Sequence, residues 1–313
     1  MTSATVAPPR TPPSTRDRNQ SVRRTRRGWA PLGFLAPFGV LYLLFVLGPT
    51  AYGFVLSFFD TSLVRPGLGN GVGFGNFADL LGSEDFWASL WHTVQFTLYT
   101  TPPLVVLSLV LAVLVNRVGR GNRLFRFAFF LPYILPSATV ALIWVFVLTP
   151  DSGGLATVLK AVGVDPPSWL GDPGWAMPSV AGVTLWWTLG FNFVLYLAAL
   201  QEIPRELYEA AAIDGAGPWQ QTARITVPLL SRTTALVTSL QLIASLKVFD
   251  QIYLMTAGAT DTRPVLEFVY DTGFTDYRVG AAAAASMLYF LLILLVSGLW
   301  LLATRRRDRE VTR

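Results

Sequence analysis

The sequence predicts an all-α polytopic membrane protein with six transmembrane helices. The 313 residues are 52% hydrophobic and 14% charged, whereas a soluble domain carries about 25% charged residues. The charges also cluster between long uncharged runs. Apolar runs of about 18 residues or more are typical of membrane spans, because ~20 helical residues cross a ~30 Å hydrocarbon core. We expect spans at roughly 31–58, 93–115, 125–148, 177–200, 231–256 and 279–303.

The distribution of basic residues predicts the orientation of these spans. The N-terminal tail, the loop "NRVGRGNRLFR", the segment 201–232 and the C-terminal end carry 19 of the 24 basic residues. The opposite loops, 59–92, 149–176 and 257–278, carry four basic residues and 11 of the 19 acids. Because short positively charged loops stay in the cytoplasm, both termini are predicted to be cytoplasmic, in a plasma or inner membrane.

The two ends of the chain are predicted to be tails. Residues 1–28 are rich in Pro, Thr, Ser and Arg and lack apolar periodicity, which indicates a disordered cytoplasmic tail. "RRTRRGW" is similar to a twin-arginine signal, but the apolar segment after it is too long for a signal peptide. We therefore expect a six-helix domain over 29–304, with its core at about 90–303, and a basic cytoplasmic tail over 305–313.

Composition excludes several kinds of site. The absence of cysteine excludes disulfides and thiolate chemistry, and a single histidine excludes multi-histidine metal sites. Gly153-Gly154 and the glycines of 69–75 lack the Lys-Ser/Thr ending of a P-loop. We expect this chain to hold no metal, cofactor or nucleotide and to bind no nucleic acid. His92, at a predicted membrane interface, is expected to be a hydrogen-bonded anchor.

Proline, alanine and aromatic residues predict details of the bundle. Pro132 and Pro136 interrupt the third span, so neighbouring helices must satisfy the freed carbonyls. Five alanines at 281–285 predict close helix contact. The stretch "GFGNFADLLGSEDFWASLW" is typical of a small amphipathic helix before the second span.

The charged stretch "ELYEAAAIDGAGPWQQTARITVPLL" predicts two short helices between the fourth and fifth spans. Pro204 suits the first turn of one helix, and Asp214-Gly215 ends that helix, because glycine takes the left-handed conformation readily. Gly217-Pro218 opens a second helix through Ile225, which Pro228 is expected to stop. The residues alone leave two readings open, an ordinary connecting hairpin and a docking surface on which small alanines admit another protein's backbone.

The spacing within this stretch resembles the EAA motif of ABC importer membrane subunits. Glu209-Ala210-Ala211, Gly215 and Ile225 stand at the motif spacing before Pro228, with Val227 where leucine is usual. "GFNFVLYLAALQEIPRELYEAAAIDGA", "SLKVFDQIYLMTAGA" and "VGFGNFADLLGSEDFWASLWHT" are similar to carbohydrate-uptake permeases of the MalF-like type, over roughly residues 30–303. "TAGATDTRP" departs from the Gly-Gly-Pro turn that is usual there.

This resemblance implies a MetI-like ABC permease fold and a transport role rather than catalysis. It implies a heterodimer with a homologous permease and two partner subunits that bind ATP and Mg²⁺ and hydrolyse ATP. It also implies an extracellular sugar-binding lipoprotein or periplasmic protein, with membrane lipid around the bundle. The coupling helix of the EAA loop, residues 201–230, would dock on the ATPase. The expected coupling residues are Glu209, Ala210, Ala211, Asp214, Gly215, Ile225 and Pro228.

Two charges inside the fifth span indicate a substrate pathway. An intramembrane charge costs about 2.5–3.5 kcal/mol on insertion scales, and Lys247 and Asp250 are three residues apart, which predicts one helix face. Either the two charges neutralise each other and brace the bundle, or they line a cavity for sugar hydroxyls. Aromatic and polar residues of the fourth span would contribute, although tryptophans there also serve as packing residues. The candidates are Trp187, Asn192, Tyr196, Ser245, Lys247 and Asp250.

Two other functions remain open at this point. An ABC permease for a polyamine or inorganic anion shares the same motif, although an anion pore favours cationic lining and Asp250 stands beside Lys247. A proton-coupled secondary transporter or a membrane enzyme usually needs inverted repeats or a cluster of catalytic ionisable groups, and neither is evident here.

Overall fold

The computed structural model describes residues 30–65, 67–117 and 122–311. The predicted tail 1–28 lies outside the described residues. The first apolar segment, 34–56, exposes most of its apolar side chains, and Leu56 at its end is buried. A π-helical turn interrupts it, so it consists of α1 (Ala30–Tyr42), η1 (Leu43–Leu47) and α2 (Gly48–Leu56).

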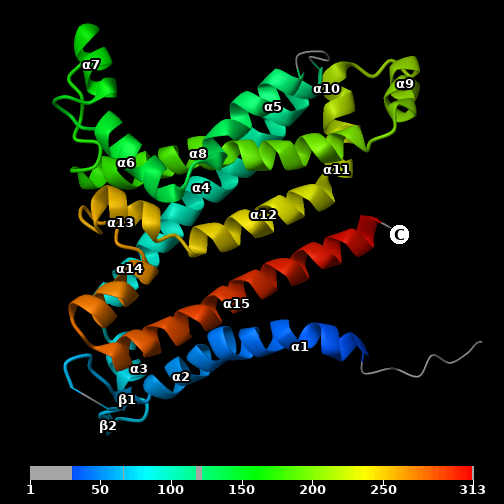
Figure 1. Cartoon of the computed structure of the whole chain (residues 1–313). Helices are drawn as coiled ribbons and strands as arrows, with labels where there is room; N and C mark the ends of the chain where they lie inside the picture. Colours follow the sequence, from blue (N-terminus) through cyan, green and yellow to red (C-terminus); the bar gives the residue numbers. More distant parts are fainter. Residues whose placement is uncertain (1–29, 66, 118–121, 312–313) are drawn as a thin grey trace, which may run out of the picture. The chain divides into compact units, whose positions relative to one another are not determined.

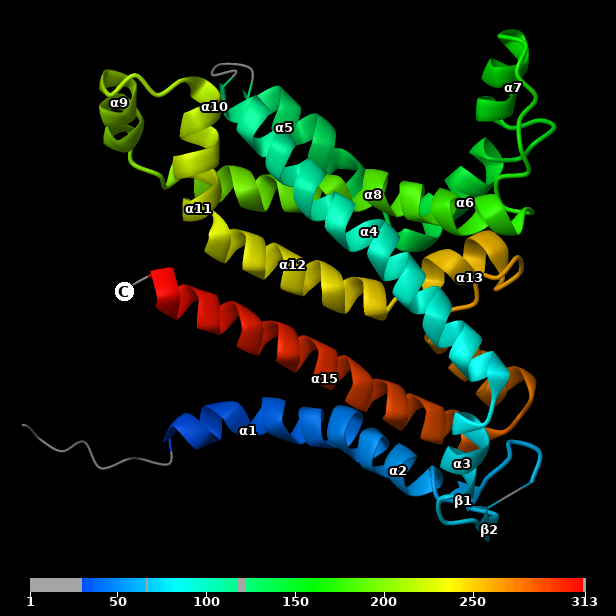
Figure 2. The same ribbon diagram turned by 180° about the vertical axis from the view of Figure 1, so that it is seen from behind.

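Long helices form the centre of the bundle from residue 51 onward (Figures 1 and 2). The helices α4 and α8 pack along each other, and α12 lies against both α4 and α15. Phe193, Tyr196 and Leu197 of α8 are buried against Ala112 and Val115 of α4. The bounds are α4 (Glu84–Arg117), α8 (Pro173–Gln201), α12 (Ser231–Leu246) and α15 (Val279–Val311).

The predicted interruption of the third span is confirmed. Residues 123–134 and 137–147 bend by 94° at the prolines. Gly190 of α8 makes room for this bend, because a Cβ there would overlap the Phe129 carbonyl and lie 2.8 Å from Phe130 Cα. The segment consists of α5 (Asn122–Phe130), the 3₁₀ turn η3 (Leu131–Ile134) and α6 (Ser137–Val147).

The predicted fifth span is broken instead of continuous. The helix α12 ends at Leu246, and α13 begins at Asp250 after a non-helical Phe249 with φ −148° and ψ −69°. The prediction that Lys247 and Asp250 share one helix face is therefore wrong. A further bend of 64° separates residues 218–229 from α12. The elements around α12 are α9 (Arg205–Ile213), α10 (Pro218–Gln221), the π turn η4 (Thr222–Thr226), α11 (Val227–Leu229) and α13 (Asp250–Thr256).

Short elements lie at the end of the bundle opposite α9 and α10 (Figure 1). The predicted amphipathic helix is shorter than expected, because Glu84 already begins α4. His92 Nδ1 lies 3.2 Å from the Arg263 carbonyl, as expected of a hydrogen-bonded anchor. The elements of this end are α3 (Gly75–Leu81), α14 (Val265–Tyr270), η5 (Asp271–Thr275) and the antiparallel pair β1 (Phe59–Asp60) and β2 (Asn70–Gly71), while α7 (Gly154–Ala161) follows α6.

Within the described residues, four helices are long and apolar enough to cross a membrane, or up to six if each bent pair is one span. The predicted close contact at the alanines is present, because Ala284 and Ala285 are fully buried. The helix α15 continues beyond the predicted span, through the basic residues 305–307 to Val311.

Glu267 of α14 is a buried carboxyl group, with 1% of its surface exposed and no hydrogen-bond partner at Oε2. Burial, together with the nearby Asp271 carboxylate, raises the pKa of Glu267 to about 7, against the opposing effect of Arg263. Arg263 itself contacts Asp85 at 3.6 Å and Asp271 at 3.9 Å. Folding therefore shifts the protonation equilibrium of Glu267 toward the neutral form.

We predict that this carboxyl group makes the protein less stable as pH rises. A carboxyl pKa raised by folding contributes stability that is present below its unfolded value of 4.5 and is lost as pH rises through about 7. The melting temperature of the purified protein in detergent should fall between pH 5 and pH 8. Glu267→Gln should reduce this fall, while the exposed Glu84→Gln should leave it unchanged. An unchanged pH dependence in Glu267→Gln would contradict the assignment.

Candidate functional site

A cavity of about 230 Å³ lies at the break between α12 and α13. Its wall comes from four parts of the chain: the break itself, the middle of α8, the first half of α4 and the start of α6. Polar side chains collect here inside an otherwise apolar bundle. The lining residues are Phe96, Thr100, Ser137, Thr184, Trp187, Thr188, Gln241, Ala244, Ser245, Lys247, Val248, Phe249, Asp250 and Gln251.

The helix break places each intramembrane charge at a helix end of favourable sign. Lys247 is the C-cap of α12, next to carbonyls that carry partial negative charge, and Asp250 is in the first turn of α13. The ion pairs of the described residues involve Lys160 and Arg263, and neither Lys247 nor Asp250 takes part in one. Mutual neutralisation of these two charges is therefore not observed, and both side chains are exposed at the cavity.

Neighbouring helices form hydrogen bonds with the residues on both sides of the break. Tyr289 of α15, which is buried, donates a hydrogen bond to the carbonyl of Leu246, the last residue of α12. Ser245 Oγ accepts one from Thr101 Oγ1 of α4 at 3.2 Å. Asp250 Oδ2 accepts one from Ser137 Oγ of α6 at 3.3 Å. Tyr289 thus supplies a partner for the last backbone carbonyl of α12, and the other two bonds link side chains at the break to α4 and α6.

The structure brings four of the six predicted pathway residues together. Trp187, Ser245, Lys247 and Asp250 line the cavity. Asn192 does not line it, and its Oδ1 accepts a hydrogen bond from Gln241 Nε2 at 2.9 Å just behind the wall. The remaining candidate, Tyr196, packs in the interior between α4 and α8. The two residues that point away are both fully buried.

An aromatic group stands beside Trp187. Tyr133 stacks on Phe191 with ring centroids 4.9 Å apart, and its ring is 6.2 Å from that of Trp187. Trp187 Nε1 donates a hydrogen bond to the Leu135 carbonyl at 3.1 Å, so the bent third segment holds the indole. Trp186, the neighbouring residue, instead packs on Trp144 with centroids 5.4 Å apart.

Sequence reasoning missed Gln251 and Thr184. Gln251 is 4% exposed, and its Oε1 accepts a hydrogen bond from Thr184 Oγ1 at 2.8 Å. Its Nε2 is a buried donor without a partner, at a cost of about 1–3 kcal/mol. Each of the two is a polar residue inside an apolar run, and this pattern could have identified them as candidates. Their contact joins residues 67 positions apart, so the sequence does not predict it.

The EAA loop forms the predicted pair of short helices. Its first helix, α9, ends in a Schellman motif, in which Ala216 N–H donates to Ala211 O at 2.8 Å and Gly215 N–H to Ala212 O at 3.1 Å. Gly215 has a φ of +80°, as its predicted role requires. Pro204 is the N-cap of α9, one position before the predicted first turn.

The prediction that Pro228 stops the second helix is wrong. The π turn η4 precedes it, so Pro228 falls in the first turn of α11, where a missing N–H costs no helical hydrogen bond. The chain turns two residues later, at Leu230. The expected coupling residues form a largely exposed surface: Glu209, Ala210, Asp214, Gly215 and Pro228 are exposed, and Ala211 and Ile225 are half-buried.

Two large apolar side chains add to this exposed surface. Ile213, the last residue of α9, is 87% exposed, and Trp219 of α10 is 81% exposed. No side chain of α9 is buried in this chain. A charged helix with exposed apolar ends is typical of a surface that another protein covers.

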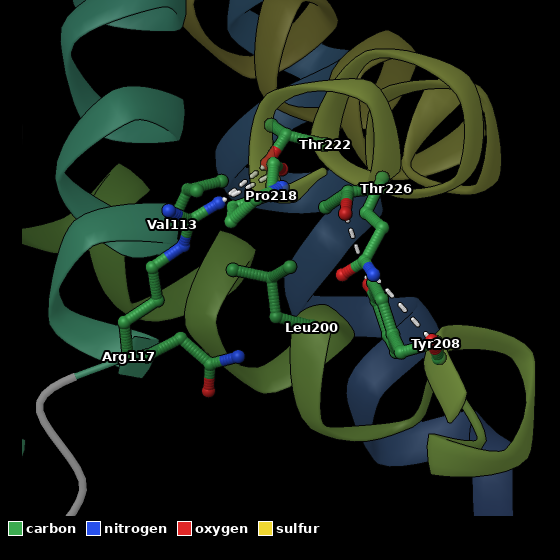
Figure 3. Close-up of a pocket in the computed structure, with 9 residues that line it drawn as sticks. Val113, Arg117, Leu200, Tyr208, Pro218, Thr222 and Thr226 are labelled. Atoms are coloured by element: carbon green, nitrogen blue, oxygen red, sulfur yellow. Dashed lines mark hydrogen bonds between the residues drawn. The ribbon is translucent and has the colours of Figure 1, made fainter. Parts of the chain in front are cut away.

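A second cavity, of about 330 Å³, lies between the EAA loop and the adjacent ends of α4 and α8 (Figure 3). Arg117 of α4 reaches α10 across it, and Tyr208 Oη of α9 lies 2.9 Å from Thr226 Oγ1. Its lining residues are Val113, Asn116, Arg117, Leu200, Tyr208, Pro218, Gln221, Thr222 and Thr226.

A membrane helical bundle with an internal polar cavity and an exposed EAA loop defines a transport permease. The family model described as binding-protein-dependent transport system inner membrane component matches residues 104–309. The chain belongs to this family, and it is an inner-membrane transport subunit rather than an enzyme. This membership leaves the secondary-transporter alternative without support.

Three relatives with named transport roles each align with four fifths or more of the chain. The sulfoquinovosyl glycerol permease of Agrobacterium fabrum is 31% identical over 301 residues, covering 93% of this chain and 97% of its own. The trehalose/maltose permease of Thermococcus litoralis is 33% identical over 262 residues, covering 81% and 87%. The sn-glycerol-3-phosphate permease of Yersinia pestis is 33% identical over 289 residues, covering 90% and 95%.

A solved structure confirms the predicted MetI-like ABC permease fold. A chain of a bacterial ABC transporter involved in import of the acidic polysaccharide alginate matches with a TM-score of 0.79 and 27% identity, covering 89% of this chain and 96% of that chain. A crystal structure of the alginate transporter with an alginate pentasaccharide-bound periplasmic protein also matches, with a TM-score of 0.78.

We predict that Tyr289→Phe destabilises the helix break. The substitution leaves the Leu246 carbonyl without its donor in a buried position, at a cost of about 1–3 kcal/mol. In detergent, Tyr289→Phe should have a lower melting temperature than the unsubstituted protein. Tyr52→Phe, at an exposed tyrosine, should leave the melting temperature unchanged. A melting temperature of Tyr289→Phe equal to that of the unmodified protein would exclude this role.

Proposed function

We propose that this chain forms half of the translocation pathway of an ABC importer for a sugar or oligosaccharide. It crosses the plasma or inner membrane six times, with the two bent pairs each acting as one span. Both termini and the EAA loop are cytoplasmic. A homologous permease completes the pathway, two ATPase subunits supply the energy, and an external binding protein or lipoprotein delivers the sugar.

The polar cavity at the helix break is the observation that carries this proposal. Hydroxyl, amide and charged groups surround it, and Gln251 Nε2 is a buried donor without a partner. A sugar hydroxyl would satisfy this donor, and the Trp187 and Tyr133 rings beside it offer flat faces to a sugar ring. The volume of about 230 Å³ is below the ~300–1,000 Å³ of pockets that enclose drug-sized ligands, which favours a second subunit completing the site.

The exposed EAA surface supports docking on an ATPase. Glu209 offers charge pairing, the alanines admit a close backbone, and Ile213 and Trp219 offer apolar contacts at the helix ends. ATP-driven closure of the ATPase pair would move this loop, and the helices attached to it would alter the cavity. The partner subunits bind ATP and Mg²⁺, and this chain holds no cofactor of its own.

A charge reversal tests the docking role of the EAA motif. In the reconstituted complex, Glu209→Arg should lower sugar-stimulated ATPase activity at least tenfold and weaken co-purification of the ATPase, because it reverses the charge that Glu209 is proposed to contribute to the docking contact. Glu206→Arg makes the same reversal on the same helix outside the motif and should have a small effect. Equal losses in both variants, or none in either, would contradict the assigned role of Glu209.

The cavity is tested at Gln251. Uptake into proteoliposomes is first screened with labelled trehalose, lactose and arabinotriose, to find a transported sugar. Gln251→Ala should then raise the KM for that sugar about 3- to 10-fold, the equivalent of one hydrogen bond, with a nearly unchanged maximal rate. Gln95→Ala, on α4 away from the cavity, is the control. Equal KM values in both variants would remove Gln251 from the pathway.

One observation favours a second candidate, a phosphorylated polyol or other anion. Lys247 is exposed at the cavity and takes part in no ion pair, and one relative is a permease for sn-glycerol 3-phosphate. Asp250 in the same wall opposes this reading, because its carboxylate would repel an anion. Competition by sn-glycerol 3-phosphate in the same uptake assay distinguishes the two candidates.

A further inference from the structure

The helix α4 connects the two cavities of the molecule. It runs without interruption from Glu84 to Arg117 in spite of Pro102 and Pro103. Phe96 and Thr100 line the cavity at the helix break, and Arg117 lies at the EAA loop. Arg117 follows Thr100 by 17 positions, which corresponds to about 25 Å of helix. One continuous helix therefore connects the two sites.

Arg117 bonds this helix to the EAA loop (Figure 3). Its Nη2 donates to the Thr222 hydroxyl oxygen at 2.8 Å and to the Pro218 carbonyl at 3.1 Å. Thr222 Oγ1 in turn donates to the same carbonyl at 2.9 Å, so Arg117, Thr222 and the Pro218 carbonyl are all hydrogen-bonded to one another. Hydrogen bonds from a charged donor are about twice as strong as neutral ones, and these join residues more than 100 positions apart.

The loop behind this contact is bonded into one unit. Tyr208 of α9 contacts Thr226 of η4 through the two hydroxyls at 2.9 Å. Gln221 Nε2 donates to the Ala216 carbonyl at 3.1 Å, which ties α10 to the turn after α9. A force on α9 is thus passed to α10, and from α10 the Arg117 guanidinium passes it to α4.

A second path from the loop uses the chain itself. The helix α11 continues through Leu230 into α12, whose Gln241 and Ser245 line the cavity at the break. This covalent path does not involve Arg117. The two paths reach different walls of the same cavity, so they can be separated by experiment.

We propose that Arg117 is a positioning residue that transmits movement of the EAA loop to α4 and, through α4, to one wall of the substrate cavity. The inference rests on the proposed docking of the EAA loop on an ATPase. Loss of Arg117 leaves the α11–α12 path intact, so it uncouples the α4 wall alone. The expected defect is an incomplete response of the cavity to ATP, with the ATPase still docked.

The absence of cysteine from this chain allows a test with single-cysteine reporters. Thr100→Cys reports on the α4 wall and Ala244→Cys on the α12 wall, since both residues line the cavity. The complex is assembled with cysteine-free partner subunits. The rate of reaction with N-ethylmaleimide is measured without nucleotide and with ATP plus vanadate, so that no transported sugar has to be known.

Both reporters should change their reaction rate at least fivefold on addition of ATP and vanadate. In Arg117→Gln, the Thr100→Cys response should be lost and the Ala244→Cys response kept. Thr222→Val, which removes one of the two acceptors of Arg117 and leaves the Pro218 carbonyl, should weaken the Thr100→Cys response selectively. Arg117→Lys, which keeps a charged donor, should restore part of the response. Arg123→Gln, an exposed arginine of α5, is the matched control and should behave like the unsubstituted chain.

The other outcomes overturn the inference in distinguishable ways. If neither reporter responds in the unsubstituted complex, the proposed coupling to an ATPase fails, and this inference fails with it. If the α12 reporter alone responds there, α4 does not move, and the proposed function stands without this inference. Loss of both responses in Arg117→Gln and Thr222→Val assigns these residues to docking, and retention of both leaves them without a transmitting role.

Discussion

The break between α12 and α13 is the constraint on which the rest of this structure depends. A helix that ends inside a membrane frees backbone groups that lipid cannot satisfy, so other helices must supply partners. Tyr289 from α15 donates to the Leu246 backbone carbonyl, while Thr101 from α4 and Ser137 from α6 donate to the side chains of Ser245 and Asp250. One break thus brings three other helices together beside the cavity, and of these three partners Ser137 is also part of the cavity wall.

The same break explains how an apolar bundle accommodates two charges. On a continuous helix, Lys247 and Asp250 would need each other or a path to water. At the break, the C-terminal carbonyls of α12 favour the ammonium group, and the N-terminus of α13 favours the carboxylate. Both groups are then free to face a solute. A discontinuous helix at a binding site is a recurring solution in transporters.

The EAA loop and the cavity lie at different positions along α4, α8 and α12. The same three helices therefore connect the loop to the cavity. The loop is rigid because of its Schellman motif, its Tyr208–Thr226 contact and the Arg117 bonds. The long helices are packed along each other, with Gly190 allowing the bent third segment to approach α8 closely. The alanine-rich face of α9 stays exposed, because it serves no packing purpose within this chain.

The sequence by itself determined the membrane class, most of the spans, the two prolines at the bend of the third segment and the position of the EAA motif. These depend on local composition, spacing and turn chemistry. Four cavity residues were also predictable, because charged and aromatic groups in apolar runs are conspicuous. Only the three-dimensional structure shows that α12 breaks at Lys247, that Asn192 and Tyr196 do not line the cavity, and that a π turn lets the helix continue past Pro228. The cavity wall and the contact of α4 with the EAA loop depend on partners distant in sequence, such as Gln251 for Thr184 and Thr222 for Arg117, which no local pattern specifies.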